Sequence, residues 1–322
     1  MLERKDIEFR KPRDFGEKFN ATFEFLRLEF KPLFKGILYV AGPFIAIAGI
    51  LGAYYQKYSL SLLDFTSDNP VEFFTRDLGI SAAGLFISSV LAYILTFAVV
   101  SEYVKIYMDT GNKSVDINPL RRAVRKNLLH YFGSAFGYFI LIVLVFFVTG
   151  TLLVGIVTLD ILLLNILVFL GFFLLIFLIT ILFYITFISY NLENPDFLGA
   201  GLRSLRLLKG NWMSTLGLLI VAYIFVTIAN IIFTLPNAIL TMVGIFHRID
   251  DNDAVQLSFF EELAYGFTSF IASAGGYFLT VILMLILIFQ YFNLVEKLDA
   301  TGLIQRIEEM GTKSNEGDDE DF

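Results

Sequence analysis

The residues that could carry out chemistry are few and poorly matched to one another. Histidine occurs only at His130 and His247, and neither belongs to a His-Glu-x-x-His pattern. The segment Arg248–Asp253 holds three aspartates, but it lacks the glycine and the ligand spacing of a calcium loop, so a solvated turn is the better interpretation. Cysteine is absent, which removes thiolate nucleophiles and thiolate metal ligands. We therefore expect no catalytic residue, no metal site, no cofactor and no enzymatic activity.

Uncharged polar and small side chains form two helical patterns instead. A polar face has spacings of three, four and three residues, which place its members on one side of a helix: Thr227, Asn230, Thr234 and Asn237. A ridge of small residues recurs at every fourth position and allows close helix approach: Ala264, Thr268, Ala272 and Gly276. We favour packing of these two faces against each other, and the alternative is an outward-facing polar cavity lined by the first of them.

Charged side chains inside membrane spans mark the ion pathways of coupled transporters. The apolar runs of this chain contain none, and Glu102 and Lys105, three residues apart, are predicted to form an ion pair at the end of a span. This pattern argues against ion-coupled transport, while passage of a neutral or lipidic substrate stays open.

The elements that position these residues follow from an unusually apolar composition. Of 322 residues, 57% are hydrophobic and 17% are charged, which indicates a polytopic membrane protein. A helix needs about 20 residues to cross the hydrocarbon core. We therefore predict an all-α bundle of six transmembrane helices in a single membrane domain, residues 1–310. The predicted spans are approximately 36–56, 78–105, 133–157, 161–190, 212–236 and 263–293.

The distribution of cations predicts the orientation. All but three of the 24 lysines and arginines lie in the N-terminal segment, the C-terminal segment and the two connections between them on the same side. Because cytoplasmic loops carry an excess of Lys and Arg, both termini should be cytoplasmic. The expected location is the bacterial cytoplasmic membrane, and no cleavable signal peptide is expected because charged residues precede the first apolar run.

The stretch 194–230 combines a short basic helix with a membrane span. Asn194 is expected to cap the helix, Pro195 to occupy its first position, and Asp196 to complement its dipole. Leucines and cations then alternate at helical spacing, and Gly210-Asn211 is expected to end the helix before Trp212. Such a helix suits the headgroup layer, so its cations and those of the preceding connection are candidate contacts for anionic lipids: Arg121, Arg122, Arg125, Lys126, Arg203, Arg206 and Lys209.

This unit of a basic helix followed by an outgoing and a returning span is predicted to occur three times. Setting Gly36, Gly137 and Gly217 in register also aligns Lys126 with Arg206, each eleven residues before its glycine, and places Arg27, nine residues before Gly36, within two positions of them. We interpret this alignment as an internal triplication, and the alternative is the common pattern of any basic loop that enters a membrane.

At these residues the chain resembles a known family. The basic helix that ends in Lys-Gly-Asn-Trp (209–212), followed by a leucine-rich span with Gly217, is similar to the membrane domain found beside some bacterial glycerophosphodiester phosphodiesterases and to related six-span bacterial proteins. In those enzymes the chemistry belongs to a separate soluble domain, which we do not expect within these 322 residues. The resemblance therefore implies the layout of residues 11–310 and carries over no catalytic residue.

The expected partners are membrane lipids, with anionic headgroups on the cytoplasmic side, and a protein partner or a second copy of the chain; no nucleic acid is expected. Residues 311–322, GTKSNEGDDEDF, should form an acidic disordered tail. Taken together, these features favour a non-enzymatic component that organises partners or lipids. The alternative is a transporter, channel or lipid-translocating protein for a neutral or amphipathic substrate.

Overall fold

The chain folds into helices joined by short connections, as a computed structural model shows. The structure describes residues 7–61, 78–111, 114–157, 162–193, 196–251 and 259–300. Within these residues there are eight helices and no strand, which confirms the all-α prediction. The helices are α1 (Phe15–Val40), α2 (Gly42–Ser61), α4 (Gly79–Asp109), α5 (Ile117–Val157), α6 (Leu162–Glu193), α7 (Phe197–Leu208), α8 (Trp212–Asp251) and α9 (Phe259–Asp299). The predicted acidic tail, residues 311–322, lies outside the described residues.

The chain is a multi-pass membrane protein. The helices α4, α5, α6, α8 and α9 are each long and apolar enough to cross a membrane, and the bent pair α1–α2 qualifies as a sixth crossing if it is counted as one span. Several of these helices exceed the roughly 20 residues that one crossing requires. They must therefore tilt or extend beyond the hydrocarbon core.

The pair α1–α2 is one path through the protein with a bend in its middle. Asp14 begins α1 with a capping box, in which its carboxylate accepts from Glu17 N and the Glu17 carboxylate accepts from Asp14 N. After Ala41 the path turns by 65° into α2. Pro43 explains the turn, because proline donates no backbone hydrogen bond and its ring collides with the carbonyl group of the preceding turn.

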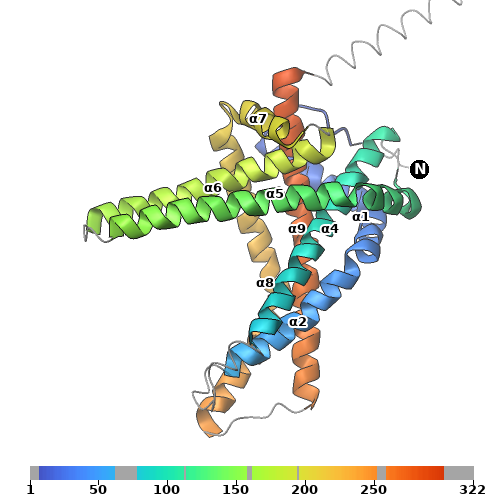
Figure 1. The fold of residues 1–322 in the computed structure, drawn as a ribbon. Coiled ribbons are helices and arrows are strands. Elements are labelled where there is room, and N and C mark those ends of the chain that lie inside the picture. The colour runs from blue at the N-terminus through green and yellow to red at the C-terminus, as the bar shows by residue number, and fades with distance from the viewer. Residues whose placement is uncertain are drawn as a thin grey trace, which may run out of the picture.

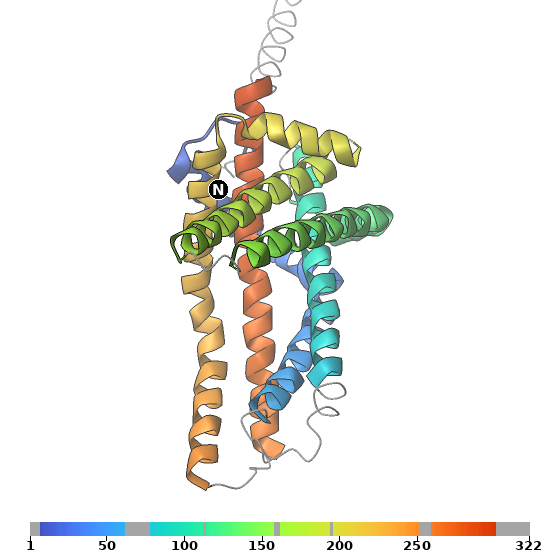
Figure 2. The ribbon, with the colours of Figure 1, turned by 60° about the vertical axis from the view of Figure 1, so that its left-hand side comes forward.

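The core is centred on the C-terminal half of α9, where residues 279–296 are almost entirely buried. In Figures 1 and 2 this helix runs through the middle of the molecule, with α8, α4 and α2 alongside it. Glycines allow the closest approaches: a Cβ atom added at Gly49 of α2 would lie 2.9 Å from Phe270 Cα of α9. One added at Gly36 of α1 would lie 2.7 Å from Leu120 Cδ2 of α5.

The hairpin α5–α6 departs from this arrangement. Figures 1 and 2 show α5 and α6 side by side, running across α8 and α9 and projecting from the rest of the molecule as an arm. The base of the arm is packed, because the Tyr138 ring contacts the Phe183 ring at 4.1 Å and the Tyr93 hydroxyl donates to the Tyr184 hydroxyl at 3.1 Å. Beyond this base, large apolar side chains are exposed, including Phe147 at 72% and Leu163 at 71%.

The three aligned basic units differ in where the helix breaks. The first bends at Ala41, after Gly36, while the third breaks between Leu208 and Trp212, before Gly217. In the second unit, α5 continues unbroken from the basic segment into the apolar run. The aligned glycines also differ in surroundings: Gly36 faces Leu120, Gly137 lies against the Phe197 ring, and Gly217 has open space beside it. The triplication therefore stays a prediction from sequence.

Candidate functional site: the basic groove between α7 and α8

A buried carboxylate on α4 connects this helix to α5. Glu102 is only 3% exposed, and its Oε1 accepts hydrogen bonds from Asn127 Nδ2 at 2.8 Å and from the Tyr131 hydroxyl at 2.9 Å, both on α5. Lys105 Nζ lies 3.8 Å from the same oxygen, which is the ion pair predicted from the sequence. These contacts join α4 to α5.

A second buried carboxylate, Glu29 of α1, is a residue that the sequence analysis missed. It is fully buried, and the Tyr103 hydroxyl of α4 donates to its Oε2 at 2.5 Å. The signal was present in the sequence, because Glu29 shares the helical face of Phe25, Leu33 and Ile37, which are among the buried apolar residues of α1. Together, Glu29 and Glu102 link α1, α4 and α5 through hydrogen bonds.

The short helix α7 begins two residues later than the sequence suggested. Asp196 is the N-cap, and its carboxylate accepts from Gly199 N at 3.2 Å. Asn194 and Pro195, the expected cap and first helical residue, lie outside the described residues, and the helix starts at Phe197. The helix starts there because the Asp196 carboxylate accepts the backbone hydrogen bond of its first turn.

The end of α7 agrees with the sequence. The helix ends at Leu208, Gly210 adopts a left-handed conformation with φ of 78°, and α8 begins at Trp212. A non-glycine residue with this φ would be strained, whereas glycine adopts it at no steric cost. This corner turns the chain from α7, which lies across the end of the bundle, into the long helix α8 (Figure 1).

The corner forms an open groove of about 550 Å³ with a mixed lining. Two leucines come from α7, two cations and a glycine from its end, and the only tryptophan of the chain from α8: Leu202, Leu205, Arg206, Lys209, Gly210 and Trp212. Apolar surface, two positive charges and an indole ring therefore border one hollow. This combination suits a lipid headgroup and the first part of its acyl chains.

The residue types on the two sides of α7 differ from those of a simple amphipathic helix. Its bundle side is made by small or apolar residues that are buried: Ala200, Ser204, Leu207 and Leu208. The leucines Leu198, Leu202 and Leu205 point outward and are 75%, 61% and 44% exposed. Leucines and cations thus share the outer surface of α7, beside the groove.

Arg203 does not belong to this outer surface. Its Nη2 donates to Glu193 Oε1 at 2.9 Å and to Asp299 Oδ2 at 2.7 Å, which joins α7 to the ends of α6 and α9. Burial alone would lower the pKa of the Arg203 guanidinium, but the hydrogen bonds to Glu193 and Asp299 outweigh burial and raise the pKa above its ordinary value. Of the seven candidate lipid contacts, Arg203 is therefore committed to an internal ion pair.

The other six candidate cations are exposed, in two places. Arg206 and Lys209 border the groove, and the remaining four lie on the first turns of α5: Arg121, Arg122, Arg125 and Lys126. Arg121 also contacts Tyr39 of α1, with its guanidinium 5.4 Å from the ring centroid and Nη1 donating to the hydroxyl at 3.3 Å.

The polar face of α8 makes contacts with α9 and α2. Asn237 Nδ2 donates to Ser269 Oγ at 2.9 Å, and Gln56 Nε2 of α2 donates to Thr241 Oγ1, one turn after Asn237. Asn230 and Thr234 are half-buried, while Thr227 is exposed. Asn230 Oδ1 is buried and has no hydrogen-bond partner among the described residues.

The small-residue ridge of α9 lies against the polar face of α8 at one of its four residues. A Cβ atom at Gly276 would lie 3.7 Å from Asn230 Oδ1, so these two predicted faces meet there. Thr268 bonds back to the carbonyl of Ala264 at 2.8 Å, and Ala264, Thr268 and Ala272 are half-buried. The glycine next to the ridge makes the closer contact, because a Cβ atom at Gly275 would collide with the Phe233 ring.

Among the described residues, no group of three histidine, aspartate or glutamate side chains is placed to hold a metal ion. His130 stacks on Tyr190 with ring centroids 3.9 Å apart, and its Nε2 lies 3.3 Å from the Tyr190 carbonyl oxygen. The side chains of His247 and of Arg248–Asp253 lie outside the part whose side chains are described, and the backbone of residues 248–251 continues α8 instead of forming the predicted turn.

A family model described as a domain of unknown function (DUF7847) matches residues 35–297. The chain belongs to this family. The DUF7847 match starts inside α1 at Lys35 and ends in the last turn of α9 at Lys297. It therefore includes the groove and the arm, and also Tyr103 and Tyr131, the two tyrosines that donate to buried carboxylates. Among curated proteins and solved structures, none matches the chain.

Proposed function

We propose that this DUF7847 protein is a non-enzymatic component of the bacterial cytoplasmic membrane that organises anionic lipids, with both termini in the cytoplasm. The observation that carries the proposal is the groove at the α7–α8 corner, where Arg206, Lys209 and Trp212 lie beside outward-facing leucines. Cations near an anionic leaflet each contribute about 1 kcal/mol, and the leucines supply apolar burial. Phospholipid with an anionic headgroup satisfies both requirements.

The single tryptophan makes the groove directly measurable. The full-length protein is reconstituted into phosphatidylcholine vesicles that contain a brominated phosphatidylglycerol as a minor component, and quenching of Trp212 fluorescence reports the local concentration of the brominated lipid. Two cations predict a preference for the anionic lipid of about 30-fold over its share of the membrane. Replacing Arg206 and Lys209 together with glutamine should remove most of this preference.

A charge-matched variant controls for the loss of two positive charges. Arg10 and Lys11 are exposed but lie outside the groove, so R10Q/K11Q should keep the preference of the native protein. Quenching that follows the mole fraction of brominated lipid in the native protein would contradict the proposal. Equal losses in the two double variants would contradict the assignment to the groove.

A second role, the docking of a protein partner or of a second copy, is favoured by the α5–α6 arm. Its outer part presents large apolar side chains on all sides, with contacts mainly between its own two helices, such as Phe146 with Phe172 at 5.9 Å. Chemical cross-linking of native membranes with a photoreactive residue in place of Phe147 tests this role. A cross-linked protein of defined mass is the expected result for docking, and labelling of lipid alone would contradict it.

The transport alternative receives less support. The polar face of α8 is engaged by Ser269 of α9 at Asn237, and the adjacent Thr241 accepts from Gln56 of α2. These hydrogen bonds favour packing of α2, α8 and α9 over a polar passage along this face.

A further inference from the structure

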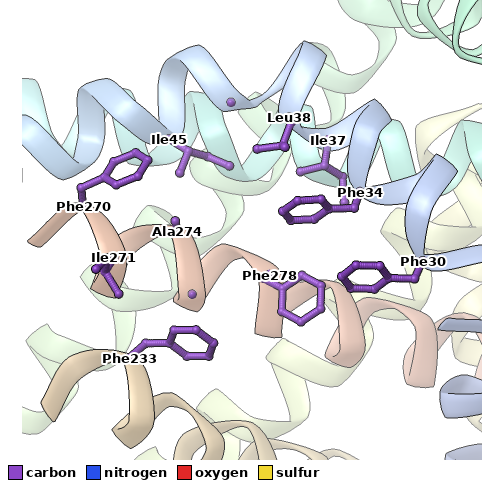
Figure 3. Close-up of a pocket in the computed structure, with 12 residues that line it drawn as sticks. Phe30, Phe34, Ile37, Leu38, Ile45, Phe233, Phe270, Ile271, Ala274 and Phe278 are labelled. Atoms are coloured by element: carbon purple, nitrogen blue, oxygen red, sulfur yellow. The ribbon is translucent and has the colours of Figure 1, made fainter. Parts of the chain in front are cut away.

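A second hollow lies on the side of the bundle, away from the α7–α8 groove. It encloses about 340 Å³ between α1, the start of α2, α8 and α9, and none of its twelve lining residues has a polar side chain. Figure 3 shows Phe30 and Phe34 of α1 facing Phe278 of α9, with Phe233 of α8 on the far side. We call this hollow the α1–α9 pocket.

Three local features create the α1–α9 pocket. The bend at Ala41 directs α2 away from the line of α1, so Gly42 and Ile45 form one end of the hollow. Gly275 lets the Phe233 ring lie against the backbone of α9. Edge contacts of Phe278 with Phe30 at 5.6 Å and with Phe34 at 5.9 Å hold the rings that form its wall.

The other end of the pocket is basic. A neighbouring hollow of about 740 Å³ shares Phe30 and Phe278 with the α1–α9 pocket and is bordered by Arg27 and Lys31. Both cations are exposed on α1. Glu24, one turn before Arg27, offsets part of this charge, and the exposed Lys35 adds to it, so this surface of α1 is cationic.

The basic end leads directly into the apolar part of the pocket along α1. Arg27, Lys31, Phe34 and Leu38 follow one another along a single face of α1. The eleven helical steps from Arg27 to Leu38 span about 16 Å, and an acyl chain that fills one leaflet is about 15 Å long. An acyl chain that starts at Arg27 would therefore end near the bend and Ile45.

We propose that the α1–α9 pocket and its basic end bind one anionic phospholipid, with an acyl chain between α1 and α9 and the headgroup phosphate at Arg27 and Lys31. This site is separate from the α7–α8 groove, and it goes beyond the proposed function because it inserts a lipid between two packed helices. A zwitterionic lipid fits the apolar part equally well but gains less from two cations. A free phosphate ion would leave the apolar pocket uncovered, so the occupant is the intact lipid.

A relocated tryptophan reports on this pocket alone. The double variant W212F/F278W removes the natural tryptophan and places one at the pocket wall, and it is reconstituted in phosphatidylcholine vesicles with brominated phosphatidylglycerol as a minor component. We expect quenching that corresponds to an enrichment of about 30-fold, equal to about 2 kcal/mol. The further substitutions R27Q/K31Q should reduce the quenching to the level set by the mole fraction, and R10Q/K11Q should leave it unchanged.

The outcomes separate this inference from the proposed function. Enrichment at position 278 without enrichment at Trp212 supports the pocket and contradicts the groove, and the reverse result does the opposite. Because Phe278 contacts two other rings, F30W in the W212F background provides a second probe at a residue that is 42% exposed. Quenching at both probes that only follows the mole fraction, or that survives R27Q/K31Q, would overturn the inference.

Discussion

Glu102 shows how a single side chain can determine the packing of two helices. Its carboxylate lies at the junction of α4 and α5 and accepts from both Asn127 and Tyr131. Membrane proteins bury such charges only where donors compensate for the lost hydration. These hydrogen bonds therefore stabilise the protein and fix the position of the basic start of α5.

Replacing Glu102 with leucine should lower the free energy of unfolding by about 3 kcal/mol, because the donors of Asn127, Tyr131 and Lys105 lose their acceptor in a buried place. Unfolding by sodium dodecyl sulfate in mixed micelles, followed by circular dichroism, measures the change. The control E24Q, at an exposed position of α1, should change stability by less than about 0.5 kcal/mol. Similar values for the two variants would show that the network is not stabilising.

Two asparagines on the same helix should respond differently to leucine. Asn237 donates to Ser269, so Asn237→Leu should destabilise the protein by about 1 kcal/mol. Asn230 Oδ1 has no partner among the described residues, so Asn230→Leu should be neutral or slightly stabilising. The same detergent unfolding measurement distinguishes them, and a larger loss for Asn230→Leu than for Asn237→Leu would contradict the observed hydrogen bonding.

At the residue scale, the sequence predicted some contacts and missed others for one reason. The pair Glu102–Lys105 was predictable because its partners are one helical turn apart. The donors Asn127 and Tyr131, like the contact of Glu29 with Tyr103, belong to other helices. Helical periodicity shows which face of a helix is buried, but it does not show which helix covers that face.

At the scale of elements, the α7–α8 corner depends on one backbone conformation. Gly210 has a positive φ, whereas Gly201 lies inside α7 with open space beside it. Gly210→Ala should therefore cost about 1 kcal/mol, while Gly201→Ala should stabilise the protein by up to about 1 kcal/mol. Thermal unfolding in detergent compares the two variants. Equal effects of the two substitutions would show that the left-handed backbone at position 210 accepts a side chain without strain.

The helices themselves were largely predictable from the sequence, whereas the way in which they pack against one another was not. The predicted span 78–105 corresponds to α4 (Gly79–Asp109), and the break at Gly210-Asn211 is present. A charge-free run of about 20 residues predicts a membrane-spanning helix, because a segment that crosses the hydrocarbon core must be apolar and must satisfy its own backbone hydrogen bonds. The start of α7 differs by two residues because Asp196 caps it. The helix α5 runs unbroken from its basic segment into the apolar run, because that segment has no residue that stops a helix.

At the scale of the whole molecule, the arm is the feature that hydropathy alone does not predict. The helices α5 and α6 have the composition of ordinary spans, yet they project across the bundle (Figures 1 and 2). Among lipids an apolar helix is stable without protein neighbours, so composition leaves its packing undetermined. Composition also leaves the groove and the α1–α9 pocket undetermined, because they depend on a corner and a bend that bring separate helices together.

The proposed lipid-organising function requires that the basic segments face the anionic cytoplasmic leaflet together. Because the chain contains no cysteine, single cysteines can be introduced for labelling without other changes. We would replace Lys126 of α5, Lys209 beside the groove and Glu261 at the opposite end of α9, and treat intact cells with a membrane-impermeant maleimide before and after permeabilisation. We expect positions 126 and 209 to react only after permeabilisation and position 261 to react in intact cells. Labelling of positions 126 and 209 from opposite sides of the membrane, or of position 209 in intact cells, would contradict the proposed function.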